Sequence, residues 1–520
     1  MTFGSLLVDF ITWFVFCYFL ALNAGYLMLN FFALRTLRRK GQELFMAELP
    51  RAYSGLEPPV SILVPAYNEE ASIAASIRSM LQLSYAEFEI VVINDGSLDA
   101  TLEVLRREFA LLPFPEAYRR QLATQEVRQV YRSTRYPNVR VIDKVNGGKA
   151  DSLNAGINAS RYPLFCGVDA DSILQRDSLS KVTEPFLRDP TVVAAGGTVR
   201  VANGCQVSGG FLTKVGLPRN FLALFQVVEY LRAFLFGRLG WSSMNGMLII
   251  SGAFGVFRKD AVVLAGGYRT DTIGEDMELV VRMHRLLRAR RQPYRIEFVP
   301  DPVCWTEAPE DYRTLRNQRI RWQRGLGESL NANWGLPLSR NGGVPGWIAF
   351  PFQLLFEWLG PVVELGGYAF MVYAFFTGLI SWQAFGAFLF VAIGLGILLS
   401  ASGLLLEEMS FHIYPRGKQL LALGAVVILE NFGYRQIIAW WRLVGLWRWA
   451  TQRKATWGEM QRSGAVRDVA AVPGAAPPSA PSGAPPAVAP SVTPSAPPVS
   501  APKAGADGSS TRPPTDLPPN

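Results

Sequence analysis

Hydrophobic positions run almost without interruption near the start of the chain. Residues 10–34 form a nearly uncharged stretch of about 25 residues, long enough to cross a bilayer core of roughly 30 Å as a helix. The chain starts without basic residues and carries Asp9, and the stretch is longer than the apolar core of a secretory signal. We therefore expect an uncleaved anchor. Four basic residues at 35–40 follow it, so its start is expected outside and its end in the cytoplasm.

Further apolar blocks lie toward the end of the chain. They cover residues 346–380, 383–406 and 418–441, and several basic residues follow them. A cytoplasmic start and a cytoplasmic end require an even number of crossings. Either the first block holds two short spans, or it contains a piece that lies at the interface or re-enters the bilayer. Charged residues inside the blocks face a bundle interior or a wet path, lie near an interface, or pair with one another; they are Glu357, Glu364, Glu430 and Arg435.

Between these apolar regions, short β-branched runs alternate with helical periodicity. The pattern predicts strands at 60–68, 89–97, 139–144 and 163–171, and helices at 69–83, 100–112 and 149–160. Strands that alternate with helices predict a mostly parallel sheet, covered on both faces. Ligands of such a sheet bind beyond the carboxyl ends of its strands, where Asp95, Asp169 and Asp171 fall.

These patterns divide the chain into four expected parts. They are an N-terminal transmembrane anchor at 1–40, a cytoplasmic α/β domain at 55–335, C-terminal transmembrane helices at 346–445 and a tail at 463–520. Of the 35 prolines, 15 fall between Pro473 and Pro519, in a stretch rich in Ala and Ser. Such a composition cannot bury enough apolar surface to fold, so we expect a disordered tail.

Composition narrows the chemistry further. The formal net charge of +9 fits nucleic acid or an anionic membrane, but basic residues cluster beside the apolar runs, without zinc-finger or aromatic RNA-binding spacing. We therefore expect no nucleic-acid partner. The four cysteines show no paired spacing, which indicates reduced thiols rather than a disulfide framework. Because the chain has only two histidines, any metal must be held by oxygen atoms.

Two acidic residues follow the fourth expected strand. Alternate side chains at a strand end share one face, so Asp169 and Asp171 can present both carboxylates to one side. Hard oxygen ligands suit Mg²⁺ or Mn²⁺ shared with phosphate oxygens, and such an ion would neutralise charge on a departing diphosphate. Turn capping is the alternative for an isolated Asp-x-Asp.

The pentapeptide QRIRW at 318–322 places Gln318, Arg321 and Trp322 on one face of a helix. A planar guanidinium can bind a diphosphate, and an indole can stack on an acceptor sugar. Further arginines surround the pentapeptide, at 313, 316, 319 and 324. A helix on a membrane surface with snorkelling arginines is therefore a second interpretation, and both can hold at once.

Six motifs in order carry a resemblance to a known family. They are PAYNEE at 65–70, NDGS at 94–97, NGGKADSLNAG at 146–156, DAD at 169–171, GED at 274–276 and QRIRW at 318–322. With them the chain resembles the membrane-embedded, inverting family 2 glycosyltransferases, which include cellulose, hyaluronan, chitin and poly-N-acetylglucosamine synthases. The resemblance implies a Rossmann-like α/β domain of GT-A type joined to transmembrane helices, in a multi-pass protein of the cell (inner) membrane.

The resemblance assigns a donor site to four residues. Tyr67, Glu69 and Asp95 would hold the uridine, and Lys149 would approach the diphosphate. The local chemistry agrees, because an aromatic face suits a base, a carboxylate suits an N–H group and a cation suits phosphate. Ordinary helix-start chemistry is the alternative for Tyr67 and Glu69, and a solvated surface charge is the alternative for Lys149.

The resemblance also assigns the chemical step. Asp276 would be the general base, at the start of a helix over 277–287 whose dipole favours the ionised carboxylate. Helix capping is the alternative for this residue. Arg321 would bind the leaving group, and residues 251–254 would line the acceptor terminus, with plain packing as the alternative.

We therefore expect a metal-dependent, inverting, processive synthase that makes a β-linked polysaccharide from a UDP-sugar and passes it through its own helices. The alternative is a non-processive enzyme acting on a lipid carrier or ceramide-like acceptor. A catalytically silent membrane partner or exporter is a third possibility, which predicts that Asp276→Asn leaves function intact. Expected partners are a UDP-sugar, the growing glycan or a lipid acceptor, membrane lipids and envelope export proteins. The NGGKADSLNAG motif favours N-acetylglucosamine.

Overall fold

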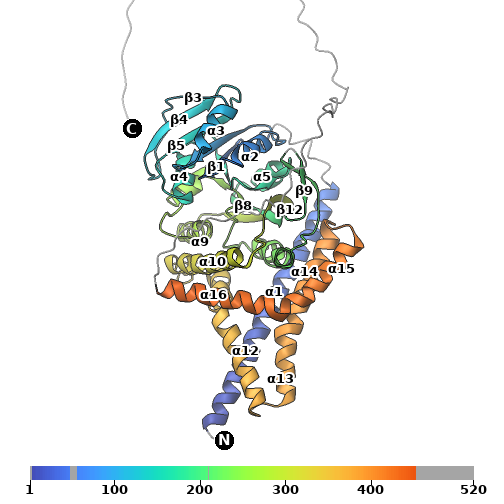
Figure 1. The fold of residues 1–520 in the computed structure, drawn as a ribbon. Coiled ribbons are helices and arrows are strands. Elements are labelled where there is room, and N and C mark those ends of the chain that lie inside the picture. Colours follow the sequence, from blue (N-terminus) through green and yellow to red (C-terminus); the bar gives the residue numbers. More distant parts are fainter. Residues whose placement is uncertain (1–2, 47–55, 209, 452–520) are drawn as a thin grey trace, which may run out of the picture. The chain divides into compact units, whose positions relative to one another are not determined.

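The computed structural model describes residues 3–46, 56–208 and 210–451, and the expected tail at 463–520 lies outside them. A ten-stranded sheet with the order β3-β4-β5-β2-β1-β6-β11-β8-β12-β7 organises the α/β part of the chain (Figure 1). Its strands are β1 (Val60–Ala66), β2 (Phe88–Asn94), β3 (Leu111–Pro113), β4 (Val127–Ser133), β5 (Val139–Lys144), β6 (Leu164–Val168), β7 (Ile173–Leu174), β8 (Val192–Val201), β11 (Phe254–Arg258) and β12 (Arg295–Thr306). A separate hairpin joins β9 (Gln206–Ser208) and β10 (Phe211–Lys214).

The sheet is mixed, so the expectation of a mostly parallel sheet is wrong. Parallel pairs join β5, β2, β1 and β6, and also β8 and β12. The other neighbours in the sheet are antiparallel. Crossover helices keep β1, β2 and β6 parallel, whereas a short turn at 134–138 joins β4 to β5 and reverses the chain. Apolar and polar residues alternate only partly over residues 127–133, so the sequence pattern did not predict this antiparallel side of the sheet.

Helices cover the sheet and close one end of it. They are α2 (Ile73–Met80), α3 (Thr101–Glu108), α4 (Lys149–Ala159), α5 (Ser178–Arg188), α6 (Phe221–Glu229), the π-helical segment η1 (Tyr230–Gly237), α7 (Arg238–Ser243), α8 (Lys259–Leu264), α9 (Glu275–Ala289) and α10 (Tyr312–Ala332). The helix expected at 149–160 is confirmed. Those expected at 69–83 and 100–112 are shorter than predicted, because residues 69–72 form a turn and residues 111–113 form β3.

The apolar segments are also helical. They comprise α1 (Phe3–Met46), η2 (Pro345–Ala349), α11 (Phe350–Phe352), η3 (Gln353–Trp358), α12 (Gly360–Phe376), α13 (Trp382–Leu389), η4 (Phe390–Gly394), α14 (Leu395–Ser410), α15 (Gly417–Leu429), η5 (Glu430–Tyr434) and α16 (Arg435–Ala450). Three helices in the described residues are long and apolar enough to cross a membrane: Phe3–Arg39, Trp382–Ser410 and Gly417–Ala450. A fourth candidate is the pair Pro345–Trp358 and Gly360–Phe376, which is bent by 47°.

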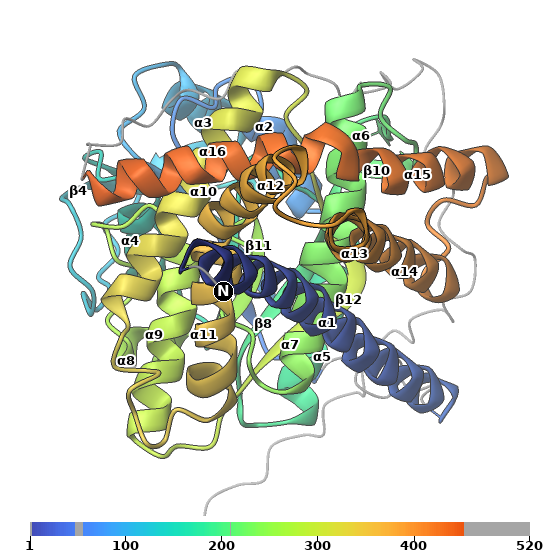
Figure 2. The same ribbon diagram turned by 90° about the horizontal axis from the view of Figure 1, so that it is seen from below.

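These apolar helices do not all run in one direction. Apolar side chains of α1 pack against α12, α13 and η4, where Phe19 contacts Tyr368 and Phe388. Figure 2 looks down the axes of α12 and α13, whereas α16 lies lengthwise in both views. Helix α16 therefore lies across α12 and α13, although the segment Gly417–Ala450 is apolar enough to span.

Three of the four charged residues named within the apolar blocks form ion pairs, with one another or with neighbours. Glu430 lies 3.6 Å from Arg435 and 4.0 Å from Arg232 of η1. Glu357 forms an ion pair with Arg442 at 2.8 Å. Pairing with one another, one of the interpretations of these charges, therefore holds for Glu430 and Arg435, whereas Glu357 pairs with Arg442, just outside the blocks.

A buried ion pair joins the sheet to the apolar helices. Arg200 of β8 donates two hydrogen bonds to Glu407 of α14, at 2.8 and 2.9 Å. Their side chains are only 3% and 2% exposed. Because both charges are removed from water, each depends on the other for its compensation.

We predict that Glu407→Ala strongly destabilises the protein. The change leaves the Arg200 guanidinium buried without its carboxylate, which costs about 3–5 kcal/mol in comparable sites. Thermal unfolding in lipid nanodiscs, followed by tryptophan fluorescence, measures the effect. The matched control is Glu408→Ala at the next, partly exposed position, which should change stability by less than about 0.5 kcal/mol. Equal melting temperatures for both variants would contradict the prediction.

Candidate functional site

One large cavity extends from the carboxyl ends of the central strands to the apolar helices. Its volume is about 1610 Å³. All ten residues singled out from the sequence line it: Tyr67, Glu69, Asp95, Lys149, Asp169, Asp171, Asp276, Gln318, Arg321 and Trp322. The same cavity is lined by Phe19 of α1, Tyr368 of α12 and Arg442 of α16.

Asp95 follows the last residue of β2 and is almost fully buried. Its carboxylate accepts hydrogen bonds from the backbone N–H groups of Gly147 and Gly148, at 3.0 and 2.8 Å. Its backbone oxygen accepts a hydrogen bond from the Asn146 side chain at 2.8 Å. Asp95 therefore holds the glycine loop before α4 in place. Its contact with uridine stays a prediction.

Lys144 supports the site from behind Asp95, and sequence reasoning missed it. Its fully buried ammonium forms ion pairs with Asp95 at 2.5 Å and Asp151 at 2.6 Å. It also donates to the backbone oxygen of Val145 at 2.7 Å. A lysine is almost never fully buried unless it is paired. The sequence signal that could have identified Lys144 was its place at the end of an apolar strand.

Tyr67 and Glu69 lie in the turn after β1. Tyr67 is 46% exposed, so its ring is open to a ligand. The Glu69 carboxylate accepts a hydrogen bond from the hydroxyl of Ser72 at 2.6 Å, next to the first residue of α2. This contact is helix-start chemistry, which agrees with the plainer interpretation of Glu69, and the residue also lines the cavity.

Lys149 is the first residue of α4 and lies among three carboxylates. It forms an ion pair with Asp169, and its ammonium donates to the backbone oxygen of Gly252 at 3.3 Å. Burial alone would lower the pKa of Lys149, but Asp169, Glu275 and Asp276 outweigh it and raise that pKa. The ammonium therefore stays charged, and it is not the solvated surface charge considered as the alternative.

The pair Asp169 and Asp171 fits a hard divalent cation. Both residues follow β6 directly and line the cavity. In the described part of the chain, no group of three or more metal-ligating side chains occurs. An ion here would therefore need phosphate and water oxygens to complete its shell, as Mg²⁺ commonly does. The Lys149 ammonium on Asp169 shows that this carboxylate attracts a cation.

Asp276 is the second residue of α9, which begins at Glu275 rather than at residue 277. Its carboxylate accepts hydrogen bonds from the N–H groups of Gly252 at 3.2 Å and Met277 at 2.8 Å. These donors hold the carboxylate beside the segment 251–254. The segment 251–254 therefore contacts Asp276 directly, as its expected place beside the acceptor requires.

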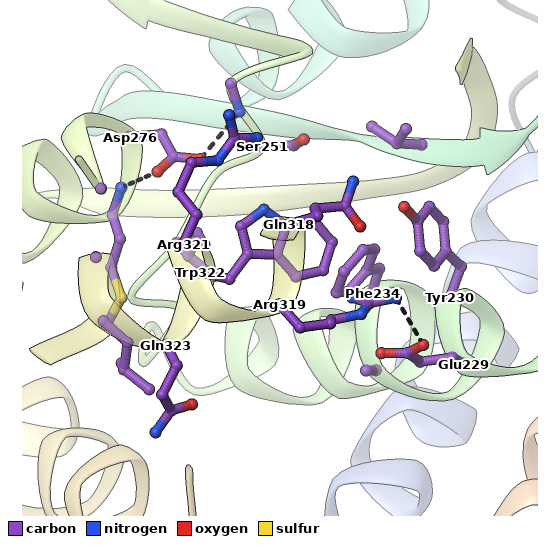
Figure 3. Close-up of a pocket in the computed structure, with 18 of the residues that line it drawn as sticks. Glu229, Tyr230, Phe234, Ser251, Asp276, Gln318, Arg319, Arg321, Trp322 and Gln323 are labelled. Atoms are coloured by element: carbon purple, nitrogen blue, oxygen red, sulfur yellow. Dashed lines mark hydrogen bonds and ion pairs between the residues drawn. The ribbon is translucent and has the colours of Figure 1, made fainter. Parts of the chain in front are cut away.

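Helix α10 carries the face that the QRIRW pentapeptide predicts. Figure 3 shows Arg321 pointing toward Asp276, and Gln318 and Trp322 directed to the same side of the helix. The side-chain oxygen of Gln318 is buried and accepts no hydrogen bond in the structure. The cavity wall at α10 thus presents a guanidinium, an amide and an indole together.

Trp322 is held by partners that the sequence did not indicate. The Arg319 guanidinium lies 4.4 Å from the indole centroid, and the Phe234 ring lies 5.7 Å from it. Arg319 is 2% exposed and donates to Glu229 at 2.9 Å, so it does not snorkel to a membrane surface (Figure 3). Glu229 also accepts a hydrogen bond from the Tyr434 hydroxyl at 2.9 Å. This network links the pentapeptide to η5.

Helix α10 meets both neighbouring helices backbone to backbone. A Cβ atom added to Gly325 would lie 3.0 Å from the Cα atom of Gly274, the residue before α9. A Cβ atom added to Gly445 of α16 would lie 2.8 Å from the backbone oxygen of Ile320. These contacts fix the position of α10 relative to α9 and α16.

We predict that Glu275→Gln flattens the pH dependence of stability. Burial raises the pKa of Glu275 from 4.5 to about 7, partly offset by Lys149. Because the raised pKa belongs to the folded state, its stabilising contribution is complete below pH 4.5 and is lost as the pH rises through about 7. The melting temperature of the unmodified protein should therefore fall more between these pH values than that of Glu275→Gln.

Asp260→Asn is the control for this prediction, because the Asp260 side chain is 71% exposed. It should keep the slope of the unmodified protein. The prediction fails if Glu275→Gln shows that same slope.

Two family models match overlapping parts of the chain. The model "Glycosyl transferase family 2" matches residues 61–209, and "Glycosyl transferase family group 2" matches residues 165–400. Together they extend over all six motifs and over the apolar helices as far as α14.

Curated relatives and solved structures were also found. Poly-beta-1,6-N-acetyl-D-glucosamine synthases of Staphylococcus epidermidis and Staphylococcus aureus (strain COL) are 28% identical over 272 residues and 31% identical over 274 residues. Each alignment covers 52% of this chain and 55% of the relative, so the chain matches about half the length of these relatives. A mannosyltransferase from Pyrobaculum calidifontis in complex with GDP-Man and Mn²⁺ aligns with a TM-score of 0.46 and 19% identity, over 81% of this chain and 99% of that chain.

The expected fold class, an α/β domain of GT-A type joined to apolar helices, is confirmed. The ordered motifs and the family matches over residues 61–400 also confirm the resemblance and the enzyme class. The chain therefore carries glycosyl transferase family 2 domains, which indicate a glycosyltransferase.

Proposed function

We propose that the chain is a metal-dependent, inverting, processive synthase that polymerises a β-linked glycan from a UDP-sugar and moves it across a membrane. The continuous cavity is the observation that carries this proposal. It begins at the carboxylates beyond the sheet and reaches Phe19, Tyr368 and Arg442 of the apolar helices. A growing polymer needs an exit that starts at the reacting centre, and this cavity supplies its beginning. The curated relatives, which carry the name of β-glycan synthases, support the same activity.

The sheet end of the cavity would bind the donor. The exposed ring of Tyr67 would stack on uracil, while Glu69 and Asp95 would accept hydrogen bonds from the nucleoside. Asp95 would also act through the glycine loop, whose N–H groups it already holds. Lys149 would exchange its contact with Asp169 for one with the diphosphate.

Asp169 and Asp171 would hold Mg²⁺ or Mn²⁺ beside the diphosphate. Bound there, the ion would neutralise charge on the departing UDP. The chain would contribute two cations of its own to this charge, Lys149 and Arg321. The Arg321 guanidinium suits phosphate because it offers paired N–H donors in one plane.

Asp276 would remove the proton from the acceptor hydroxyl. The acceptor oxygen would then form its bond to the anomeric carbon as the bond to the diphosphate breaks on the opposite face, which converts an α-linked donor into a β-linkage. Trp322 would support the acceptor ring, and Gln318 would donate to or accept from its hydroxyl groups.

The apolar helices would place this site at the cytoplasmic face of the cell (inner) membrane. Residues 1–40 would form the anchor, 55–335 the catalytic domain and 346–445 the helical region of a multi-pass protein. α12 and α13–α14 would supply two crossings, which returns the chain to the starting side. The transverse α16, rich in Trp and Arg, would rest at the interface.

We predict that Asp276→Asn lowers sugar transfer at least about 10²-fold, because the amide cannot accept the proton. UDP affinity should remain, since the change preserves the shape of the side chain. UDP release and product size are measured in lipid nanodiscs with a panel of UDP-sugars. Asp271→Asn, an exposed carboxylate near α9, is the matched control and should transfer normally.

Product size also separates the two acceptor classes. A long polymer from one donor, absent with Asp276→Asn, would support the synthase. Addition of one sugar only when a lipid acceptor is supplied would replace it with the non-processive lipid glycosyltransferase. Full activity of Asp276→Asn would refute the role of Asp276 as general base in either kind of enzyme.

We also predict that Asp171→Asn raises the Mg²⁺ or Mn²⁺ concentration needed for half-maximal transfer. The variant removes one of two anionic ligands, so the ion should bind at least about 10-fold more weakly. Removal of divalent cations with EDTA should stop transfer by the unmodified protein. Asp177→Asn, whose carboxylate is 52% exposed beside α5, serves as the control. An unchanged metal requirement in Asp171→Asn would count against this metal site.

A further inference from the structure

Arg238 is a buried cation that pairs with no carboxylate in the described residues. It is the first residue of α7, lines the cavity and is 8% exposed. Its guanidinium lies 4.6 Å from the centroid of the Phe234 ring. Within residues 3–46, 56–208 and 210–451, the guanidinium forms no hydrogen bond or ion pair.

The other buried arginines show how unusual this is. Arg140, Arg200 and Arg319 each form an ion pair with a carboxylate, at 2.6, 2.8 and 2.9 Å respectively. Arg238 is the one buried arginine of the described residues that lacks such a pair. The structure leaves no Arg238 nitrogen atom fully buried and unpaired, so its N–H donors open into the cavity, where a ligand can accept hydrogen bonds from them.

Electrostatics place Arg238 beside the reacting centre. Burial lowers its pKa to about 10, and Asp276 and Tyr230 act in the opposite direction. The side chain therefore remains charged at neutral pH. Phe234, on which the guanidinium lies, also contacts Trp322, with ring centroids 5.7 Å apart. Arg238 thus borders the space between the proposed base and the proposed sugar platform.

We propose that Arg238 binds the terminal sugar of the acceptor glycan and selects an acceptor that carries a neutral oxygen group at this point. Its N–H groups donate to a hydroxyl oxygen of this sugar, or to the carbonyl oxygen of an acyl-amino group on it. A neighbouring hydroxyl of the same sugar loses its proton to Asp276. This inference rests on the proposed glycosyl transfer and names the acceptor contact that the transfer uses.

Charge on the surrounding wall favours a neutral acceptor over a uronate. Asp276 already supplies negative charge to Arg238. A sugar carboxylate would bring a further negative charge beside Asp276, whereas a hydroxyl or carbonyl oxygen accepts from the guanidinium without adding charge.

The test compares the unmodified full chain with Arg238→Met, which keeps the apolar stem and removes the donors, and with Arg238→Lys, which keeps one cation. Proteins in lipid nanodiscs receive the UDP-sugar that supports turnover, with short β-linked oligosaccharides of N-acetylglucosamine, glucose or glucuronate as acceptors. UDP affinity, donor hydrolysis by water and transfer to each oligosaccharide are measured separately. Arg258→Met, at a partly exposed position outside the cavity, is the matched control.

We expect Arg238→Met to raise the acceptor KM at least about 10-fold, the scale of one or two lost hydrogen bonds. UDP affinity should stay within about twofold, and the ratio of transfer to hydrolysis should fall about 10-fold, because water needs no Arg238 contact. Arg238→Lys should recover part of the acceptor affinity. Arg258→Met should match the unmodified protein.

Three results would overturn the inference. If UDP affinity and donor hydrolysis fell in proportion to transfer, Arg238 would instead act in the donor site or in the stability of the fold. An unchanged acceptor KM in Arg238→Met would remove its role in binding. Preference of the unmodified protein for the glucuronate acceptor would refute the neutral-acceptor class. Failure of the proposed function is distinct, because the unmodified protein would then transfer no sugar at all.

Discussion

The arrangement of this site depends on how closely α10 approaches α9. Gly274 and Gly325 meet without an intervening side chain, and a methyl group on either would force the two backbones apart. Asp276 lies two residues after Gly274, and Arg321 lies one helical turn before Gly325. The backbone contact therefore sets the separation between the proposed base and the proposed ligand of the leaving group. The side chains of the site then adjust on backbone positions that this contact has already fixed.

Ion pairs between buried charged side chains stabilise the rest of the cavity wall. Lys144 forms ion pairs with two carboxylates behind the glycine loop, and Arg319 is neutralised by Glu229 behind the indole of Trp322. Neither cation needs to touch a substrate to matter, since each holds a group that we propose to contact one. The unpaired guanidinium of Arg238 stands out against this background, because every comparable cation has its carboxylate.

Sequence patterns could predict the strand ends and the residues that lie there, since an apolar run that stops at a carboxylate marks both. They could not predict the partners of those residues. Glu229 and Tyr434 lie 205 positions apart, and no local periodicity records a contact over that distance. Arg319 shows the same limit: helical spacing placed it near Trp322, but spacing cannot distinguish a buried cation from a solvated one. The antiparallel flank of the sheet escaped prediction because its strands alternate only weakly.

The close contact at Gly445 has a consequence for how such a chain can evolve. Helix α16 has one face pressed against the backbone of α10 and another that exposes apolar residues, among them Trp440. The first face cannot accept even alanine without displacing the helix that carries Arg321 and Trp322. Adaptation to bilayers of different lipid composition is therefore confined to the outer face, where residues can be exchanged while the inherited reaction geometry stays unchanged.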